Sequence, residues 1–250
     1  MSSAQAFNDQ ELIELLGLVD QADSVELKLT VEEPAQRSVV EALEMDPLDA
    51  QIRQVLFFDT PDLALDRAGV VVRARRSQGK ADDTVVKLRP IDPADLPAAL
   101  RKTKGFGVEV DAMPGGFVCS GSLKGEAKAK VHEMARGEAA LSDLFSPAQR
   151  ELFAERAPEG IELDDLAVLG PVFVLKLKFS PRDYGRKLVA ELWLYPDYSP
   201  VLELSTKCLP GEAFQVAAET RAFLAKRGVD MEGEQQAKTR KALEFFSARL

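Results

Sequence analysis

Cysteine and histidine are scarce in this sequence of 250 residues, and each scarcity argues against a class of site. The two cysteines, Cys119 and Cys208, form no motif, so we expect structural thiols and a reducing cytoplasm. The single histidine, His132, lies in a polar helical stretch, which argues against a histidine-based catalytic triad or a histidine-rich zinc site. No run of about eighteen apolar residues is present, and the N-terminus lacks the features of a signal peptide, so we expect neither a membrane span nor export.

Basic residues are outnumbered, at 32 lysines and arginines against 41 acidic residues, for a net charge of -9. This balance disfavours nucleic acid and anionic membranes as partners, although a local basic pocket remains possible. The apolar content of 46% is sufficient to build a core, and the length suits one large β-rich domain or two small ones. We expect a single domain over residues 1–250 that binds a small molecule, and the oligomeric state stays open.

Hydrophobic periodicity predicts a mixed α+β chain. An amphipathic helix is expected over residues 7–21, and two helices are expected at the C-terminal end. Between residues 120 and 165 strand signals vanish while alanine, glutamate and lysine become frequent, which predicts a helical insertion. The predicted strands are "SVELKLTV", "QIRQVLFFDT", "GVVVRARR", "DDTVVKLRP", "FGVEVDAM", "FVLKLKF", "KLVAELWLY" and "VLELSTK".

Seven of these strands alternate between one apolar face and one face rich in charge. An antiparallel sheet with one dry and one solvated face would show this pattern. A closed barrel with helices outside and charges inside would show it too. The barrel is favoured because charges of both signs, rather than Thr, Ser and Gln, dominate the polar face. Its cations are Lys28, Arg73, Arg75, Lys87, Arg89, Lys176, Lys178 and Lys207, and its acids are Glu26, Glu109, Asp111, Glu191 and Glu203.

A charged interior is costly unless its charges are compensated. Mutual pairing satisfies some of these groups, and the excess of cations calls for an anion. A triphosphate suits a long cavity, because arginine binds phosphate oxygens in pairs and lysine acts as a point charge. The acids are then expected to hold Mg²⁺ or Mn²⁺, which prefer oxygen ligands and substrate phosphates.

The segments "VELKL", "FFDTPDLALDRAGVVVRARR", "VVKLRP", "VLELSTK" and "AKTRKAL" together resemble the CYTH family, also called triphosphate tunnel metalloenzymes. That family includes class IV adenylyl cyclases, thiamine triphosphatases and inorganic triphosphatases. The resemblance runs from about residue 22 to residue 245, and its most specific piece is the FDTP…L…G…R-x-R segment. It implies an eight-stranded antiparallel β-barrel that encloses a charged tunnel, with helices packed outside.

The resemblance also implies roles for individual residues. Glu26 and Glu203 correspond to metal-binding carboxylates. Glu109, Asp111 and Glu191 are further acids, any of which could orient the attacking water. Trp193 on the charged face could stack on a base or thiamine ring, or simply pack at the tunnel mouth. The phosphate-binding cations are expected to be Lys28, Arg73, Arg75, Lys87 and Arg89, joined by Lys176, Lys178, Lys207 and the C-terminal Lys238.

Two positions depart from the family pattern. The opening signature E-x-E-x-K begins here with Ser24, and Ser205 stands where relatives often carry a second glutamate. A serine hydroxyl is a weak, neutral metal ligand, so both changes should weaken divalent-metal binding. Three functions follow: a metal-dependent triphosphatase, a binding module for polyphosphate or nucleotide without turnover, and an adenylyl cyclase.

Overall fold

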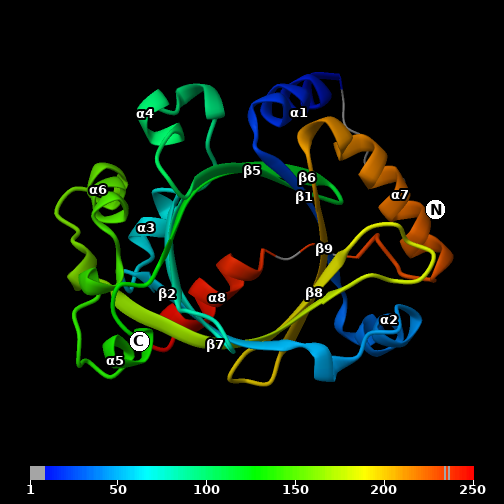
Figure 1. Cartoon of the computed structure of the whole chain (residues 1–250). Helices are drawn as coiled ribbons and strands as arrows, with labels where there is room; N and C mark the ends of the chain where they lie inside the picture. Colours follow the sequence, from blue (N-terminus) through cyan, green and yellow to red (C-terminus); the bar gives the residue numbers. More distant parts are fainter. Residues whose placement is uncertain (1–8, 234, 236) are drawn as a thin grey trace.

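The computed structural model describes residues 9–233, 235 and 237–250. The described residues form nine strands that close into one barrel, in the order β1-β5-β6-β4-β3-β2-β7-β8-β9 (Figure 1). The strands are β1 (Ser24–Val31), β2 (Gln51–Asp59), β3 (Val70–Ser77), β4 (Asp83–Leu88), β5 (Phe106–Met113), β6 (Gly116–Glu126), β7 (Ala167–Phe179), β8 (Leu188–Leu194) and β9 (Pro200–Cys208).

The predicted closed barrel is confirmed, but its strand number and one strand direction were wrong. There are nine described strands rather than eight, and β1 runs parallel to β5, with Ser24 opposite Glu109 and Glu26 opposite Asp111. The other neighbouring pairs are antiparallel. Alternation of side chains tells which face a residue takes, but it does not tell which strands pair or in which direction.

The ladder of strand pairs in the barrel wall is interrupted beside β1, and we call this interruption the wall gap. The β1–β5 ladder ends at Leu27 and Ala112, whereas β1 continues to Val31. Beyond that point the backbone N–H of Thr30 donates to the side-chain oxygen of Gln235, at 2.9 Å. The chain that leads into the last helix therefore lies against β1 where β5 no longer does.

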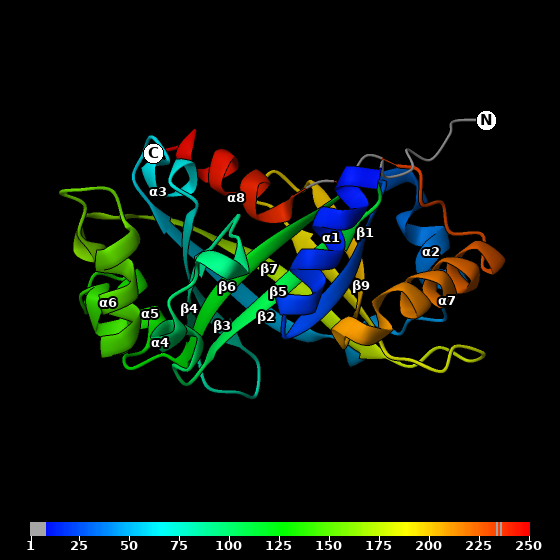
Figure 2. The same ribbon diagram turned by 90° about the horizontal axis from the view of Figure 1, so that it is seen from above.

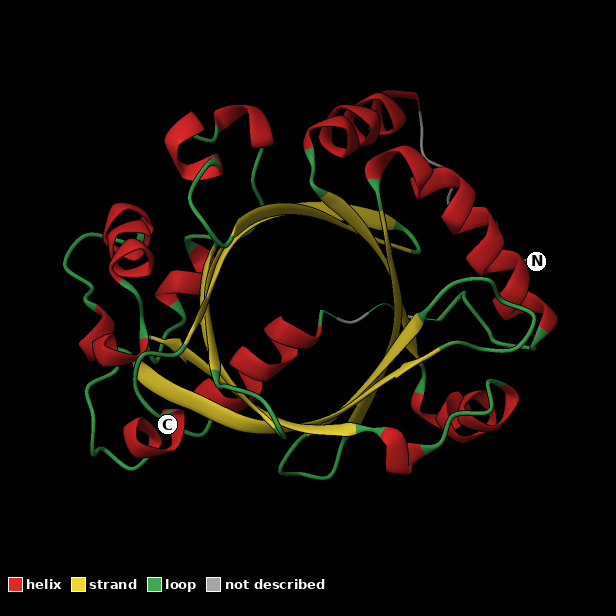
Figure 3. Ribbon diagram, viewed as in Figure 1, coloured by secondary structure: helices red, strands yellow, loops and turns green. Residues whose placement is uncertain are grey.

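Helices surround the ring of strands (Figure 3). Most cover the apolar outer face, where Val25 and Leu29 are buried under neighbouring segments. The last helix differs: Figures 1 and 2 show it across one end of the barrel, where its Ala242 and Leu243 join the apolar cluster around Phe57. The helices are α1 (Asp9–Gln21), α2 (Gln36–Ala42), α3 (Ala64–Arg67), α4 (Ala98–Arg101), α5 (Val131–Ala135), α6 (Pro147–Arg156), α7 (Ala213–Lys226) and α8 (Lys238–Ser247).

Two predicted boundaries shift. Strand β6 continues to Glu126, so the helical segment before β7 begins later than residue 120; small and polar residues in "CSGSLKGE" hid the strand. The N-terminal helix is described from Asp9, and positions 7 and 8 of the prediction lie outside the described residues. In the part of the chain that the structure describes, no helix has both the length and the apolar character needed to cross a bilayer.

One buried amide fixes the helical segment to the barrel. Gln149 of α6 is fully buried, and its side-chain oxygen accepts a hydrogen bond from the Thr84 hydroxyl at 3.1 Å. Its side-chain nitrogen donates to the backbone oxygens of Thr84 and Leu123, at 3.2 and 3.1 Å. These bonds tie α6 to both β4 and β6. Breaking them would be costly, because buried polar groups without partners destabilise the fold.

Candidate phosphate-binding cavity

A cavity of about 600 Å³ lies inside the ring of strands, and charged side chains dominate its lining. We call it the charged cavity. Although the whole chain is acidic, the described lining contains eleven lysines and arginines against five acidic residues. The cations are Lys28, Arg53, Arg73, Arg75, Lys87, Arg89, Lys124, Lys176, Lys207, Lys238 and Arg240, and the acids are Glu26, Asp66, Glu109, Glu191 and Glu203.

The parallel pairing of β1 with β5 brings three carboxylates together. Glu26, Glu109 and Asp111 each offer an oxygen within 4.8 Å of the other two, and we call them the carboxylate triplet. The ammonium of Lys28 lies 2.8 Å from Asp111 Oδ1 and 3.3 Å from Glu26 Oε2. Burial alone would lower the pKa of Lys28, but Asp111 and Glu26 outweigh it and the pKa is raised.

Asp111 is fully buried and stays ionised because cations surround it. Arg89 donates to Asp111 Oδ2 at 2.9 Å, and Lys87 Nζ lies 3.8 Å from the same oxygen. Burial tends to raise the pKa of Asp111, but Lys28, Lys87 and Arg89 overcome that tendency and lower it. A permanently charged carboxylate at this position suits a structural role or a metal ligand better than a proton carrier.

A second pair of acids, Glu191 and Glu203, lies opposite each other on β8 and β9. Lys238, the first residue of α8, contacts both: Nζ lies 2.6 Å from Glu203 Oε1 and forms a shorter contact with Glu191. Lys176 lies 2.7 Å from Glu191 Oε1. Burial would raise the pKa of Glu191, but Lys238 and Lys176 hold it well below its usual range. Glu203, expected as a metal ligand, therefore lies outside the carboxylate triplet and is paired with an ammonium.

Arg73 stands apart because it has no acidic partner among the described residues. Its Nε is buried and makes no hydrogen bond with the described residues. Burial, reinforced by the nearby charge of Arg75, lowers the pKa of Arg73 to about 10. Arg75 instead pairs with Asp83 at 2.9 Å. A half-buried guanidinium whose Nε has no partner among the described residues, and which faces a cavity, favours an anionic ligand.

Lys87 is also poorly compensated. Burial lowers its pKa to about 8, although the charge of Asp111 opposes the effect. The carboxylate oxygen nearest to its ammonium, Asp111 Oδ2, is 3.8 Å away and already accepts a hydrogen bond from Arg89. Among the expected phosphate-binding residues, Lys87 and Arg73 are thus the two whose positive charge a bound anion would stabilise most.

The "FDTP" segment, which carries the most specific part of the family resemblance, positions the end of β2 and the start of β3. Asp59 is buried and accepts hydrogen bonds from the backbone N–H groups of Leu65 and Asp66, at 2.8 and 3.0 Å, which caps α3. Gly69 then turns the chain into β3 with a φ of 74°, and an added Cβ would lie 2.9 Å from the carbonyl oxygen of Arg89. This close approach sets β3, with Arg73, beside β4.

One expected phosphate-binding residue lies elsewhere. Lys178 lies two residues after Lys176 on β7, an even spacing (the same parity) that places both on one face, but it is exposed and is not part of the described lining. Parity gives the face of a strand and not the depth along the barrel, so Lys178 lies beyond the end of the cavity. The other expected cations and four of the five expected acids line the charged cavity, while Asp111 reaches it through its pairs with Lys28 and Arg89.

Sequence reasoning missed Arg53, which is 7% exposed and lines the charged cavity. Its inward neighbours on β2 are Val55 and Phe57, so the segment did not show an alternating charged face. The signal was Arg53 itself, a charge two residues before the apolar run 55–58. Its guanidinium donates twice to the side-chain oxygen of Gln51, at 3.0 and 2.8 Å.

Trp193 is 3% exposed, and described neighbours pack against its ring. The ring of Phe57 stacks on it with centroids 6.2 Å apart, and Lys238 Nζ lies 5.1 Å from the ring centroid. The indole N–H donates to Glu191 Oε2 at 3.3 Å. Trp193 is therefore packed at the α8 end of the cavity, where it anchors Lys238.

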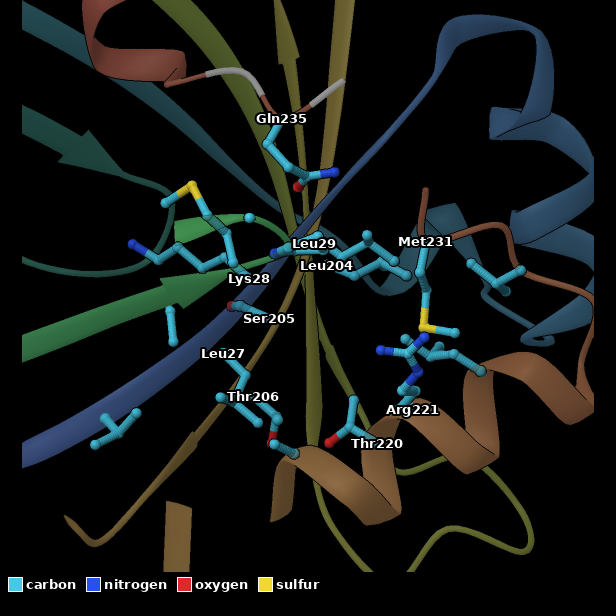
Figure 4. A pocket seen from close by; sticks show the side chains of 18 of the residues that line it. Leu27, Lys28, Leu29, Leu204, Ser205, Thr206, Thr220, Arg221, Met231 and Gln235 are labelled. Carbon is cyan, nitrogen blue, oxygen red and sulfur yellow. The ribbon is translucent and has the colours of Figure 1, made fainter. Parts of the chain in front are cut away.

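A second cavity, of about 950 Å³, lies between the outer faces of β1 and β9 and helix α7 (Figure 4). We call it the apolar cavity, because leucine, valine and methionine side chains dominate its lining. Figure 4 shows Lys28 extending to the opposite side of β1 from Leu29 and Leu204. This arrangement separates the charged inner face of β1 from its apolar outer face.

No protein-family model matches the sequence, and no curated protein matches it either. Solved structures do match. A protein from Hippeastrum, named as an adenylyl cyclase with a dominant triphosphatase activity, is 15% identical with a TM-score of 0.62, over 87% of this chain and 94% of that one. A protein from Bacillus halodurans, named as an adenylate cyclase, is 12% identical with a TM-score of 0.59, over 87% of this chain and 98% of that one. The chain therefore has the barrel fold of these two proteins.

Proposed function

We propose that the chain belongs to the CYTH family and binds a triphosphate in the charged cavity, where it hydrolyses a phosphoanhydride bond with the help of Mg²⁺ or Mn²⁺. The observation that carries the proposal is Arg73, whose buried Nε has no partner among the described residues in a cavity where cations outnumber acids. The triphosphatase activity named for the Hippeastrum protein, which shares the fold, supports the same reaction.

The cations would bind and orient the phosphoryl groups. Arg73 and Lys87, whose charges are least compensated, would contact phosphate oxygens directly, and Arg75 and Arg89 would add to the positive field. Water attacks the terminal phosphorus as the bond to the bridging oxygen breaks, which releases orthophosphate and leaves the diphosphate. Fixed cations stabilise the charge that develops on these oxygens.

The carboxylate triplet fits a divalent cation, since Mg²⁺ and Mn²⁺ prefer oxygen ligands and its three oxygens lie within 4.8 Å of one another. A bound cation would neutralise phosphate charge and acidify a water molecule. Within the triplet we assign Glu109 to orienting the attacking water, which leaves Glu26 and Asp111 to hold the cation. Glu191 is held by two ammonium groups and Asp111 by two close cations, whereas the partner of Glu109, Lys207, has a side chain that is 52% exposed.

A binding module without turnover is the second candidate, and the two serines favour it. Ser24 lies 3.5 Å from Glu109, and Ser205 is buried, so neither adds a carboxylate to the cavity. Adenylyl cyclisation is the third, suggested by the names of the two matching structures. The burial of Trp193 removes one candidate platform for adenine. The free cysteines suit a reducing cytoplasm as the setting.

The test is a substrate panel of tripolyphosphate, thiamine triphosphate and ATP, each with Mg²⁺, with Mn²⁺ and without metal. We expect metal-dependent release of phosphate that is lost in Arg73→Met and retained in Lys178→Met, a matched change at an exposed cation. Calorimetric binding of tripolyphosphate without release by the native protein would favour the binding module. Cyclic AMP from ATP would favour the cyclase, and absence of binding to any compound would refute all three functions.

A further inference from the structure

The charged cavity and the apolar cavity adjoin each other. Lys28, Met113 and Gln235 line both of them. These three residues lie around the wall gap, where β5 ends at Met113 and β1 continues beside Gln235. The interior of the barrel and the apolar cavity therefore meet at this edge of β1.

The two cavities have opposite chemistry. The apolar cavity is lined on the barrel side by Leu27, Leu29 and Leu204, and on the helical side by Leu224 of α7 and by Met231. At the boundary stands the ammonium of Lys28, which contacts Glu26 and Asp111. A ligand that fills both cavities must carry a polyanion at one end and an apolar group at the other.

We propose that the substrate is a triphosphate ester of an apolar organic group, with its phosphates in the charged cavity and its organic group in the apolar cavity. Lys28 would then bind the phosphate next to the ester oxygen, where the ligand passes through the wall gap. This inference rests on the proposed function and deepens it, because it names the class of triphosphate.

The aromatic residues of the charged cavity support an apolar group that leaves the barrel. Phe57 and Trp193 are the aromatic residues of its described lining, and both are buried against each other. No aromatic face of that lining is open for a flat ring inside the barrel. The apolar cavity, at about 950 Å³, offers the larger space for an organic substituent.

The test uses a homologous series of triphosphates: tripolyphosphate, and methyl, butyl and octyl triphosphate, measured by calorimetry with the full chain. Burial of each methylene group stabilises the complex by ~0.8 kcal/mol, or about fourfold in affinity, at most. We expect affinity to rise by about twofold to fourfold for each added methylene, with a negative heat-capacity change that grows along the series.

A pair of neighbouring variants locates the organic group. Ala217 of α7 lines the apolar cavity, whereas Ala218 next to it is exposed and outside the lining. Ala217→Trp should fill the cavity and reduce octyl triphosphate to the affinity of methyl triphosphate, while tripolyphosphate binds as before. Ala218→Trp should leave the whole series unchanged. Circular dichroism and thermal unfolding establish whether both variants fold. If Ala217→Trp does not fold, Ala217→Leu fills the cavity with a smaller side chain.

The outcomes separate this inference from the function on which it rests. Tight tripolyphosphate binding with no gain along the alkyl series would overturn the inference and leave the proposed function standing. A gain along the series that persists in Ala217→Trp would place the organic group elsewhere and equally overturn it. Failure of tripolyphosphate and all three esters to bind would refute the proposed function itself.

Discussion

Replacement of Arg73 by methionine should move stability and ligand affinity in opposite directions. Methionine keeps an unbranched side chain of similar reach but removes a half-buried charge whose buried Nε has no partner among the described residues. The fold should therefore become more stable, whereas a triphosphate loses a direct contact. A residue that only supports the barrel would change both quantities in the same sense.

The size of the stability change follows from the pKa of Arg73, which burial lowers from the ordinary value of an arginine to about 10. Each unit of pKa corresponds to about 1.4 kcal/mol, so holding the guanidinium charged in the fold costs roughly 3 kcal/mol before solvent screening. We expect Arg73→Met to raise the free energy of unfolding by roughly 1–3 kcal/mol, which for a chain of this length raises Tm by about 2–4 °C per kcal/mol. Urea unfolding at pH 7.5 without ligand measures this change in the free energy of unfolding.

The affinity change follows from the contact that is lost. A hydrogen bond to a charged group contributes about 1.5–3 kcal/mol, so tripolyphosphate should bind roughly 10- to 150-fold more weakly to Arg73→Met. Lys178→Met is the control: the side chain is exposed and outside the cavity lining, so both quantities should stay within about 0.5 kcal/mol of native. A destabilised Arg73→Met, or one that binds tripolyphosphate at native affinity, would refute the reasoning.

Two further predictions concern Lys87 and Gln149. The pKa of Lys87 is about 8, below its ordinary value because of burial, so near pH 8–9 a bound triphosphate should draw a proton onto it. Calorimetry in buffers of different ionisation enthalpy should detect uptake of up to one proton, absent in Lys87→Met, and affinity should fall as pH rises above 8. Native-like uptake in Lys87→Met would contradict this. Gln149→Leu should lower the free energy of unfolding by roughly 2–4 kcal/mol, because it leaves the Thr84 hydroxyl and two buried carbonyls without their hydrogen-bond partner. Glu151→Leu, at an exposed position of the same helix, should change the free energy of unfolding little. Equal urea midpoints for the two variants would contradict the anchoring role of Gln149.

Much of the site could be predicted from period-two alternation. Arg73 and Arg75 share parity on β3, and closure of the barrel turns that parity inward. Lys178 shows the limit of the argument, because parity does not give the position of a residue along the barrel axis. Arg53 was missed for the converse reason: its inward neighbours are apolar, since α8 and Trp193 make one end of the interior apolar.

The grouping of the acids could not be predicted, because it depends on which strands are neighbours. Glu26 meets Glu109 and Asp111 only through the parallel β1–β5 ladder, a pairing that no local pattern encodes. Glu203 was expected beside Glu26 as a metal ligand, but it lies with Lys238 from the far end of the sequence. Long-range contacts of this kind follow from topology, which alternation leaves open.

Strand β1 closes the barrel on both sides, and this has a consequence for how the protein is made. Its partners are β5 and β9, and β9 ends at Cys208, so the ring cannot close until the nascent chain has emerged as far as β9. Until then β8 and β1 are open edges, which readily pair with other chains. A chain that terminates before residue 200 would therefore carry eight of the eleven cations of the charged cavity with no closed barrel around them.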